Sequence, residues 1–310
     1  MAYYLGIDGG GTKTRCLLGD ETTVLASAMT GGSNIIRLGE TQVREALHTV
    51  VHHVCATAGI APGQIHAICI GVAGASIPEV AAKIRGILIE LMPQINLTHI
   101  EVVGDNVIAL EAAFGTGPGV IAIAGTGSLV YGRDAAGRTA RAGGWGFAIS
   151  DEGSGHWIGR RAISAILQAR DQGLETALAA MILHAWKLGT IDELVQQANS
   201  TPPPDFPHLF PVVLHAAEEG DSIARDLLAD AGAKLANLAT AVIRRLAPHP
   251  SMERAATELL PLAMTGSVFR QSPEVRQVFY NTLQTSFPGI DVCQELADPV
   301  EGALARARRM

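Results

Sequence analysis

The chain has 310 residues, of which 48% are hydrophobic and 17% charged, and its formal net charge is −7. At about 150 residues per domain this length predicts two domains, and the apolar content excludes wholesale disorder. The acidic balance argues against a nucleic-acid partner. Apolar runs are far shorter than the roughly 18 residues of a membrane span, so no membrane partner is expected. The N-terminus lacks a basic stretch followed by an apolar one, which predicts no signal peptide and a cytoplasmic location.

In chain order, the first part of the sequence predicts β-β-β-α-β-α-β-α. Short apolar segments between glycine turns indicate strands, and apolar residues at helical spacing indicate helices. The expected strands are 3–8, 12–19, 22–30, 65–72 and 99–103, and the expected helices are 40–58, 79–91 and 107–114.

The glycine-rich segment 115–119 predicts a break between domains. After it we expect strands at 120–124, 128–133 and 138–142, mostly helix over 157–247 with a Pro-rich interruption at 202–204, strand at 259–264, helix at 273–283, strand at 290–293 and helix at 299–308. The predicted domains are therefore 1–116 and 117–296, the second with a helical insertion. The C-terminal segment, about 297–310, is expected to pack back on the first domain.

The two halves begin with similar segments. The sequence L-G-I-D-G-G-G-T-K at 5–13 aligns without gaps with I-A-I-A-G-T-G-S-L at 121–129, so that two glycines and one hydroxyl residue coincide. Each segment reads as strand, glycine turn and strand. A chance match between two glycine turns is the alternative, but the shared hydroxyl and strand context favour an internal duplication.

Each glycine turn predicts a phosphate-binding hairpin. Glycines let backbone N–H groups approach phosphate oxygens, and Lys13 adds positive charge. The dinucleotide fingerprint is absent, and a P-loop does not fit because the first turn leads into a strand rather than a helix. Ordinary hairpin turns are the alternative, although they need fewer glycines. The nearby hydroxyl donors are Thr12, Thr14, Thr126 and Ser128.

Three carboxylates lie next to these loops or follow strands. Asp8 ends the first strand where the repeat has Ala124, so it is a candidate Mg²⁺ ligand, with a turn-capping role as the alternative. Asp105 lies between a strand and a helix, so it is a candidate base for phosphoryl transfer or a helix N-cap. Asp151 can accept hydroxyls of a sugar or cap the following helix.

Seven segments carry a wider resemblance. In order, they are D-G-G-G-T-K-T at 8–14, G-G-S-N at 31–34, G-D-N at 104–106, G-T-G-S at 125–128, G-G-W-G with D-E-G-S-G within 143–155, T-G-S-V-F at 265–269 and P-V-E-G-A-L-A-R-A at 299–307. Together they resemble the acetylglucosamine-kinase-like branch of the BadF/BadG/BcrA/BcrD ATPase family, which belongs to the actin, hexokinase and Hsp70 superfamily. The first and fourth segments together are the specific part.

The resemblance implies an α/β fold of two ribonuclease-H-like domains with ATP in the cleft between them. It implies an ATP-dependent kinase that phosphorylates a hexosamine, N-acetylglucosamine at O6, with Mg²⁺ held by Asp8 and with Asp105 as catalytic base. The implied ATP-binding residues are Gly10, Gly11, Thr12, Lys13, Thr14, Gly125, Thr126, Gly127, Gly266 and Ser267. The implied sugar-binding residues are Ser33, Asn34, Asp105, Asn106, Thr126, Gly144 and Asp151.

Other functions stay open at this stage. A glucosamine or N-acetylmuramic acid kinase and a nucleotide- or sugar-sensing module are alternatives, and so is an ATPase that activates a radical dehydratase. The last needs a cysteine-bound iron–sulfur cluster, and the four cysteines are scattered without any C-x-x-C pair. Ile35 and Ile36 after Asn34, and Ser150 before D-E-G-S, depart from the family pattern and leave the sugar open. A homodimer is the default assembly.

Overall fold

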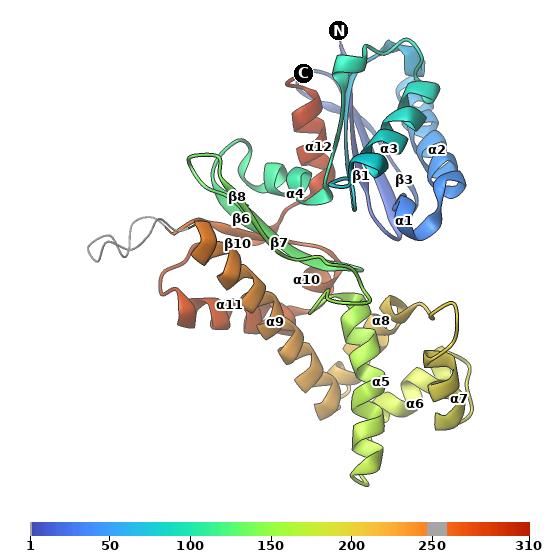
Figure 1. Ribbon diagram of the computed structural model, residues 1–310, viewed down its shortest axis with the longest axis vertical. Coiled ribbons are helices and arrows are strands. Elements are labelled where there is room, and N and C mark those ends of the chain that lie inside the picture. Colours follow the sequence, from blue (N-terminus) through green and yellow to red (C-terminus); the bar gives the residue numbers. More distant parts are fainter. Residues whose placement is uncertain (1, 247–258) are drawn as a thin grey trace. The chain divides into compact units, whose positions relative to one another are not determined.

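The computed structural model describes residues 2–246 and 259–310, and the chain divides into two compact units. Unit 1 comprises Met1–Ile121 with Ala297–Met310, and unit 2 comprises Ala122–Leu296. Each five-stranded sheet is accompanied by helices, which confirms the α/β class predicted from the sequence (Figure 1).

The helices and strands follow the expected order. The first sheet and its helices comprise β1 (Tyr3–Gly9), β2 (Lys13–Gly19), β3 (Val24–Gly31), α1 (Ile35–Leu38), α2 (Glu40–Ala58), β4 (Ile65–Val72), α3 (Pro78–Leu91), β5 (Ile100–Val103), α4 (Asp105–Phe114) and α12 (Pro299–Ala307). The second comprises β6 (Gly119–Ala124), β7 (Ser128–Arg133), β8 (Thr139–Gly143), α5 (Gly155–Asp171), α6 (Ala177–Ala185), α7 (Ile191–Ala198), α8 (Phe210–Glu218), α9 (Ser222–Leu246), β9 (Leu262–Thr265), α10 (Ser267–Gln271), α11 (Pro273–Ser286) and β10 (Val292–Leu296).

A few boundaries differ from the prediction. Helix α4 begins at Asp105, two residues earlier than expected, and the short helices α1 and α10 are additional. The strand expected at 259–264 starts only at Leu262. Residue 247, the expected end of the long helical region, lies outside the described residues.

The two sheets have the same connectivity. In the first the strand order is β3-β2-β1-β4-β5, and in the second it is β8-β7-β6-β9-β10. The first three strands of each sheet follow one another across the sheet, and the fourth and fifth lie on the other side of the first. Both fifth strands run parallel to the fourth, and both third strands run antiparallel to the second. This agreement supports the duplication inferred from the glycine segments.

Alternating side chains of the first sheet pack on two different helix layers. Leu5 and Ile7 of β1 lie in the core formed with α2 and α3. Leu17 of β2 and Cys69 of β4 lie on the other face, where they pack against α12 and α4. Successive residues of a strand point to opposite faces, so the even-numbered residues of β1, including Asp8, point to the α12 side.

Helix α12 packs very closely on its neighbours. A Cβ atom on Gly6 of β1 would lie 2.3 Å from the backbone nitrogen of Leu304, and one on Gly302 would lie 2.0 Å from the carbonyl oxygen of Ile108 in α4. Real Cβ atoms are not found this close to backbone atoms, so both positions require glycine. The absence of these two side chains brings α12 into backbone contact with β1 and with α4.

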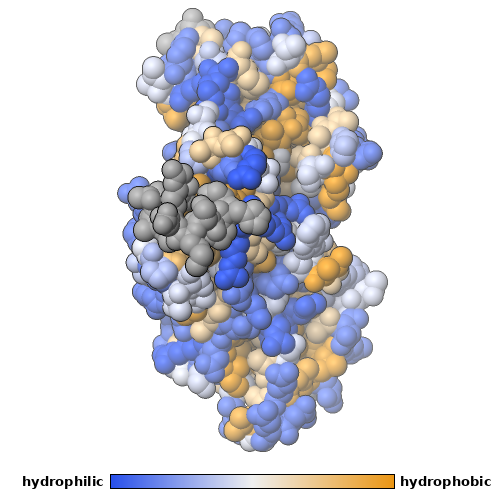
Figure 2. Space-filling model, turned by 60° about the vertical axis from the view of Figure 1, so that its left-hand side comes forward, coloured by the Kyte–Doolittle hydropathy of each residue, from blue (hydrophilic) through white to orange (hydrophobic). Residues whose placement is uncertain are grey.

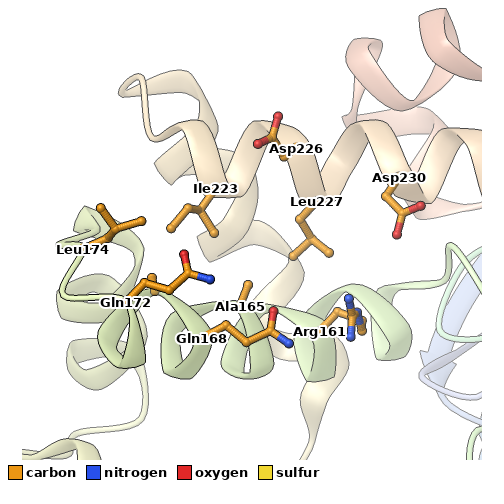
Figure 3. Close-up of a pocket in the computed structure, with 10 residues that line it drawn as sticks. Arg161, Ala165, Gln168, Gln172, Leu174, Ile223, Asp226, Leu227 and Asp230 are labelled. Atoms are coloured by element: carbon orange, nitrogen blue, oxygen red, sulfur yellow. The ribbon is translucent and has the colours of Figure 1, made fainter.

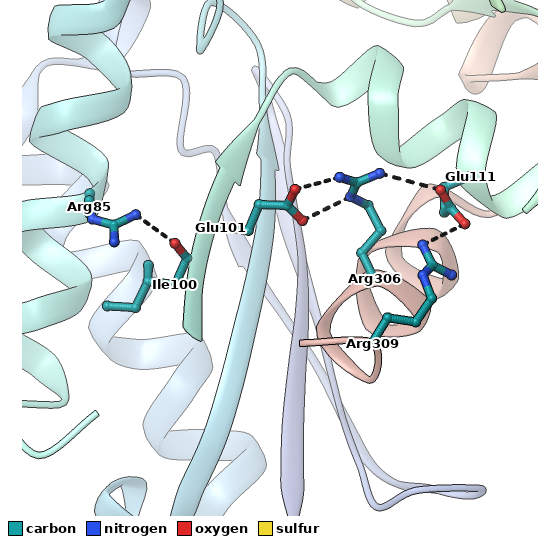
Figure 4. A network of polar contacts seen from close by, with 6 residues as sticks. All are labelled: Arg85, Ile100, Glu101, Glu111, Arg306 and Arg309. Atoms are coloured by element: carbon teal, nitrogen blue, oxygen red, sulfur yellow. Dashed lines mark hydrogen bonds and ion pairs between the residues drawn. The ribbon is translucent and has the colours of Figure 1, made fainter. Parts of the chain in front are cut away.

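A cluster of charged side chains fastens the same helix (Figure 4). Arg306 of α12 donates two hydrogen bonds to Glu101 of β5, and its guanidinium lies 3.4 Å from Glu111 of α4. Arg309 lies 2.7 Å from the second oxygen of Glu111, whose side chain is only 1% exposed. A carboxylate so deeply buried is stable only with its charge partners, so this cluster ties α12 to α4 and β5.

The surface is mostly hydrophilic on the face shown in Figure 2, with hydrophobic side chains in smaller groups between. Among the helices within 2–246 and 259–310, none combines the length and the apolar character needed to cross a lipid bilayer.

The charged cluster leads to a stability prediction. Replacing Arg306 with Met removes the partner of Glu101 and one of the two partners of Glu111, and breaking a buried ion pair in this way costs about 3 kcal/mol. We expect a clearly lower midpoint of thermal unfolding, measured by circular dichroism. Arg160→Met, on the exposed face of α5, is the control and should change the stability by less than about 0.5 kcal/mol. Equal midpoints for the two variants would contradict this role.

Candidate functional site

The glycine turn between β1 and β2 is shaped by close backbone contacts. The Gly10 N–H donates to the carbonyl oxygen of Lys13 at 3.0 Å, which closes the hairpin. A Cβ atom on Gly9 would lie 2.5 Å from the Ser33 hydroxyl oxygen, and one on Gly32 would lie 2.6 Å from the Gly11 carbonyl oxygen. The turn therefore fits against the segment that follows β3 only because these residues have no side chains. Thr12 and Lys13, at its tip, are exposed.

Two buried hydroxyl groups connect this turn to the segment that follows β3. The Thr14 hydroxyl donates to the Ser33 hydroxyl oxygen at 2.8 Å, and both side chains are fully buried. The Ser33 N–H donates to the Gly10 carbonyl oxygen at 3.0 Å. Thr14 and Ser33, which the resemblance assigns to ligands, thus join the glycine turn to the segment after β3. The next residue, Asn34, caps α1 by accepting from the N–H groups of Ile36 and Arg37.

Asp8 and Asp105 lie at the same edge of the first sheet. Strands β1, β4 and β5 are parallel, so their carboxyl ends meet at one edge, where Asp8 stands near the end of β1 and Asp105 follows β5. Burial, followed by the negative charges of Asp105 and Asp298, raises the pKa of Asp8 to about 7. The positive charges of Arg15 and Lys13 act in the opposite sense on this pKa. The sequence indicated that each residue stands at the end of a strand, and the parallel pairing of the strands places both at one edge.

The position of Asp105 differs from that of an N-cap. The cap of α4 is Gly104, and Asp105 is the first residue within the helix. One of its carboxylate oxygens accepts a hydrogen bond from the Asn106 N–H at 2.9 Å. A negative charge is favourable beside the unpaired N–H groups of a helix start. The carboxylate is thereby held at the strand end, where ligands bind in α/β sheets.

The equivalent turn in unit 2, between β6 and β7, is bonded to the start of α5. The Gly125 N–H donates to the Gly127 carbonyl oxygen at 2.9 Å, and the Gly155 N–H donates to the Gly125 carbonyl oxygen at 2.8 Å. The Ser128 hydroxyl donates to the carbonyl oxygen of Glu152 at 2.7 Å, and the backbone N–H of His156 donates to the carbonyl oxygen of Thr126 at 3.2 Å. The G-T-G-S and D-E-G-S-G motifs are therefore one local structure.

Asp151 has an unusual backbone conformation. Its φ angle is +70°, in the left-handed region, and its side chain is buried. A Cβ atom on Gly127 would lie 2.9 Å from a carboxylate oxygen of Asp151, so the two residues are in contact. The cap of α5 is Ser154, which accepts from the Trp157 N–H, so the capping alternative for Asp151 is wrong. Strained backbone of this kind clusters at functional sites, which directs attention to this carboxylate.

Gly266 and Ser267 lie against the same turn. Gly266 follows β9 with a φ angle of +106°, and a Cβ atom on it would lie 2.2 Å from the Ala124 carbonyl oxygen. The Ser267 hydroxyl oxygen lies 4.0 Å from the Cβ position of Gly125. Unit 2 therefore brings together the residues from the two separate motifs, G-T-G-S and T-G-S-V-F, that the resemblance assigned to the nucleotide. Gly144, with a φ angle of +68°, follows β8 and contacts Leu129 of β7.

The acidic edge of unit 1 has the chemistry that Mg²⁺ requires. Magnesium binds oxygen ligands and usually keeps several waters, so that one or two carboxylates and the substrate phosphates complete its coordination. Asp8 is a half-buried carboxylate, and no hydrogen bond or ion pair among the described residues reaches it. Within the same residues, no group of three or more His, Cys, Asp or Glu side chains is placed to hold a metal. The arrangement suits a magnesium ion carried in with phosphates.

A cavity of about 290 Å³ lies elsewhere in unit 2, between α5 and α9 (Figure 3). Arg161 and Gln168 of α5 and Asp226 and Asp230 of α9 are among the residues that line it, and Asp230 points toward α5. None of the residues singled out by the motifs lines this cavity.

The comparisons with known proteins agree with the fold. Residues 5–305 match the profile of the BadF/BadG/BcrA/BcrD ATPase family. The chain is 32% identical to an N-acetylmuramic acid/N-acetylglucosamine kinase of Clostridium acetobutylicum over 99% of both chains, and 28% identical to an N-acetyl-D-glucosamine kinase of Dictyostelium discoideum over 97% and 96% of the two. A solved structure from Chromobacterium violaceum, described as a candidate N-acetylglucosamine kinase, gives a TM-score of 0.76 at 28% identity over 99% of both chains.

Paired five-stranded sheets of equal connectivity define an α/β protein of the class that contains actin-like ATPases and sugar kinases. Within that class, the chain belongs to the BadF/BadG/BcrA/BcrD ATPase family, as its motifs predicted.

The raised pKa of Asp8 predicts a pH-dependent stability. The folded protein binds this proton more tightly than the unfolded chain, so the stabilisation is complete below a pH of about 4 and is lost as the pH rises through about 7. Asp8→Asn carries no charge at any pH. We therefore expect its unfolding midpoint, relative to that of the parent protein, to rise between pH 4 and pH 8 in metal-free buffer. A difference that does not change with pH would contradict the raised pKa.

Proposed function

We propose that the protein is an ATP-dependent amino-sugar kinase that phosphorylates a hexosamine, N-acetylglucosamine at O6. The observation that carries this proposal is the pair of glycine hairpins, each between the first two strands of a sheet and each beside a carboxylate. Membership of an ATPase family and the names of the relatives in Clostridium and Dictyostelium support it.

The nucleotide would be bound by backbone N–H groups of both hairpins. In the β1–β2 turn these belong to Gly10, Gly11, Thr12 and Lys13, with Thr14 behind them, and in the β6–β7 turn to Gly125, Thr126 and Gly127. Gly266 and Ser267 would lie beside the adenosine. What supports these assignments is the close packing around both glycine turns, together with the capacity of glycine turns to present backbone N–H groups to phosphate oxygens. Mg²⁺, held through Asp8, would neutralise charge on the triphosphate.

Asp105 would act as the catalytic base. It would accept the proton of the sugar hydroxyl while that oxygen forms a bond to the γ-phosphorus and the bond between this phosphorus and the β–γ bridging oxygen of ADP breaks. Its position at a strand end, beside Asp8 and at the start of α4, supports this role. The sugar would be bound by Ser33, Asn34, Asp105, Asn106, Thr126, Gly144 and Asp151. The buried, left-handed Asp151 is the strongest of these on structural grounds.

We expect two functional domains, one for each unit. We propose that residues 1–116 with 297–310 form one functional domain and residues 117–296 the other. Because ATP is the substrate, we also propose that the enzyme works in the cytoplasm. A homodimer is the assembly we expect, and sedimentation would test it.

The radical-dehydratase activator is less well supported. It requires cysteine ligands for an iron–sulfur cluster, and Cys16, Cys55 and Cys69 are buried in the core of unit 1. Burial raises the pKa of the Cys55 thiol to about 11, which disfavours the thiolate that binds iron.

Measuring ADP release with a panel of amino sugars tests the proposal. We expect fast release with N-acetylglucosamine and slow release without sugar, with glucosamine and N-acetylmuramic acid as competing substrates. Release that does not depend on any sugar would support a simple ATPase and overturn the kinase assignment.

A variant at position 105 tests the catalytic role. Asp105→Asn keeps the side-chain shape but cannot take the proton, so we expect kcat to fall by at least about 100-fold. Nucleotide affinity, measured by calorimetry, should stay nearly unchanged. Asp171→Asn, at the exposed end of α5, is the control and should keep full activity. Substantial turnover by Asp105→Asn would remove this residue as the base.

A further inference from the structure

Asp8 has a positively charged neighbour that is paired with a different carboxylate. Strands β1 and β2 are antiparallel, and Asp8 pairs directly with Arg15 in their register. Directly paired residues carry their side chains on the same face, with Cβ atoms about 5 Å apart. Arg15 would therefore be the natural ion-pair partner of Asp8. Its guanidinium instead donates to a carboxylate oxygen of Asp298 at a distance of 2.6 Å.

Asp298 is well fixed for this contact. It is the N-cap residue of α12, although its side chain makes no capping hydrogen bond, and the carboxylate is directed to Arg15 instead. Helix α12 is held against β1 and α4 by glycine contacts at Gly6 and Gly302. A carboxylate at the start of such a helix cannot move far, so its position relative to β2 is set by the packing of unit 1.

As a result, the oxygens of the Asp8 carboxylate are available to bind a cation. Among the described residues, no hydrogen bond or ion pair reaches it, even though Arg15 is directly across the sheet. A bidentate ion pair between Arg15 and Asp8 would occupy the carboxylate oxygens that a cation needs. It would also cancel the negative charge that attracts the cation.

We propose that Asp298 is a positioning residue for cation binding, because it holds Arg15 away from Asp8 and so leaves the Asp8 carboxylate available to a divalent ion. This inference rests on the proposed role of Asp8 in binding Mg²⁺. Asp298 and Arg15 both lie outside the D-G-G-G-T-K-T motif at 8–14, so that motif does not indicate this function for them. The opposing effects of the two charges on the pKa of Asp8 agree with their both lying near it.

Three variants separate this mechanism from a simple loss of negative charge. Asp298→Asn releases Arg15, which can then pair with Asp8, so cation affinity should fall about tenfold, a coupling typical of one ion-pair network. Arg15→Gln removes the competitor, so its affinity should equal or exceed that of the parent protein. The double variant Asp298→Asn/Arg15→Gln has no arginine to release, and its affinity should return to within about threefold of that of Arg15→Gln.

Titration of the full-length protein with Mn²⁺, followed by electron paramagnetic resonance with saturating ADP, measures these affinities without any turnover. If the double variant binds Mn²⁺ as weakly as Asp298→Asn, the negative charge of Asp298 acts by itself and the proposal is wrong. An unchanged affinity of Asp298→Asn also overturns it. Misfolding cannot imitate the expected result, because removing a second side chain would not restore a misfolded protein.

Asp8→Asn separates this proposal from the function on which it rests. If Asp8→Asn binds Mn²⁺ as tightly as the parent protein, Asp8 is not the cation ligand, and its proposed role fails together with that of Asp298. If Asp8→Asn loses affinity while Asp298→Asn does not, the metal role of Asp8 stands and only the positioning role of Asp298 fails.

Discussion

The close packing of α12 against β1 and α4 is the constraint on which unit 1 depends. Gly6 and Gly302 allow backbone contact, and the buried Glu111 is neutralised by Arg306 of α12 and by Arg309 just after it. Asp298 is the N-cap residue of α12, Asp8 is the penultimate residue of β1, and Asp105 is the first residue of α4. A change in how α12 lies would therefore alter the spacing of three carboxylates at once, which explains why so many side chains fasten one short helix.

Sequence patterns were sufficient for most elements of the fold. Alternation of apolar residues and glycine turns located the strands around both hairpins, and helical spacing located α2 and α3. The equal strand order of the two sheets agrees with the alignment of 5–13 with 121–129. Boundaries were harder, because Asp105 is compatible with both the cap and the first turn of a helix, and only the backbone of Gly104 decides between them.

Contacts between distant segments could not be predicted in the same way. The hydroxyl pair of Thr14 and Ser33 joins residues 19 positions apart, and the Arg15–Asp298 ion pair joins residues 283 positions apart. Periodicity reports which face of an element is buried but not which side chain of another element it meets. The left-handed backbone of Asp151 was equally hidden, although a cluster of glycines around it was visible in the sequence.

The order of segments in unit 1 has a consequence for biosynthesis. Unit 2 is one continuous stretch, whereas unit 1 needs residues on both sides of it. On the ribosome, where domains fold as units while the chain emerges, unit 2 can reach its native structure first. Until α12 has been translated, the surface of the unit 1 sheet beside Gly6 and Cys69 stays uncovered. The newly made chain therefore passes through a stage in which this apolar surface is open to chaperones.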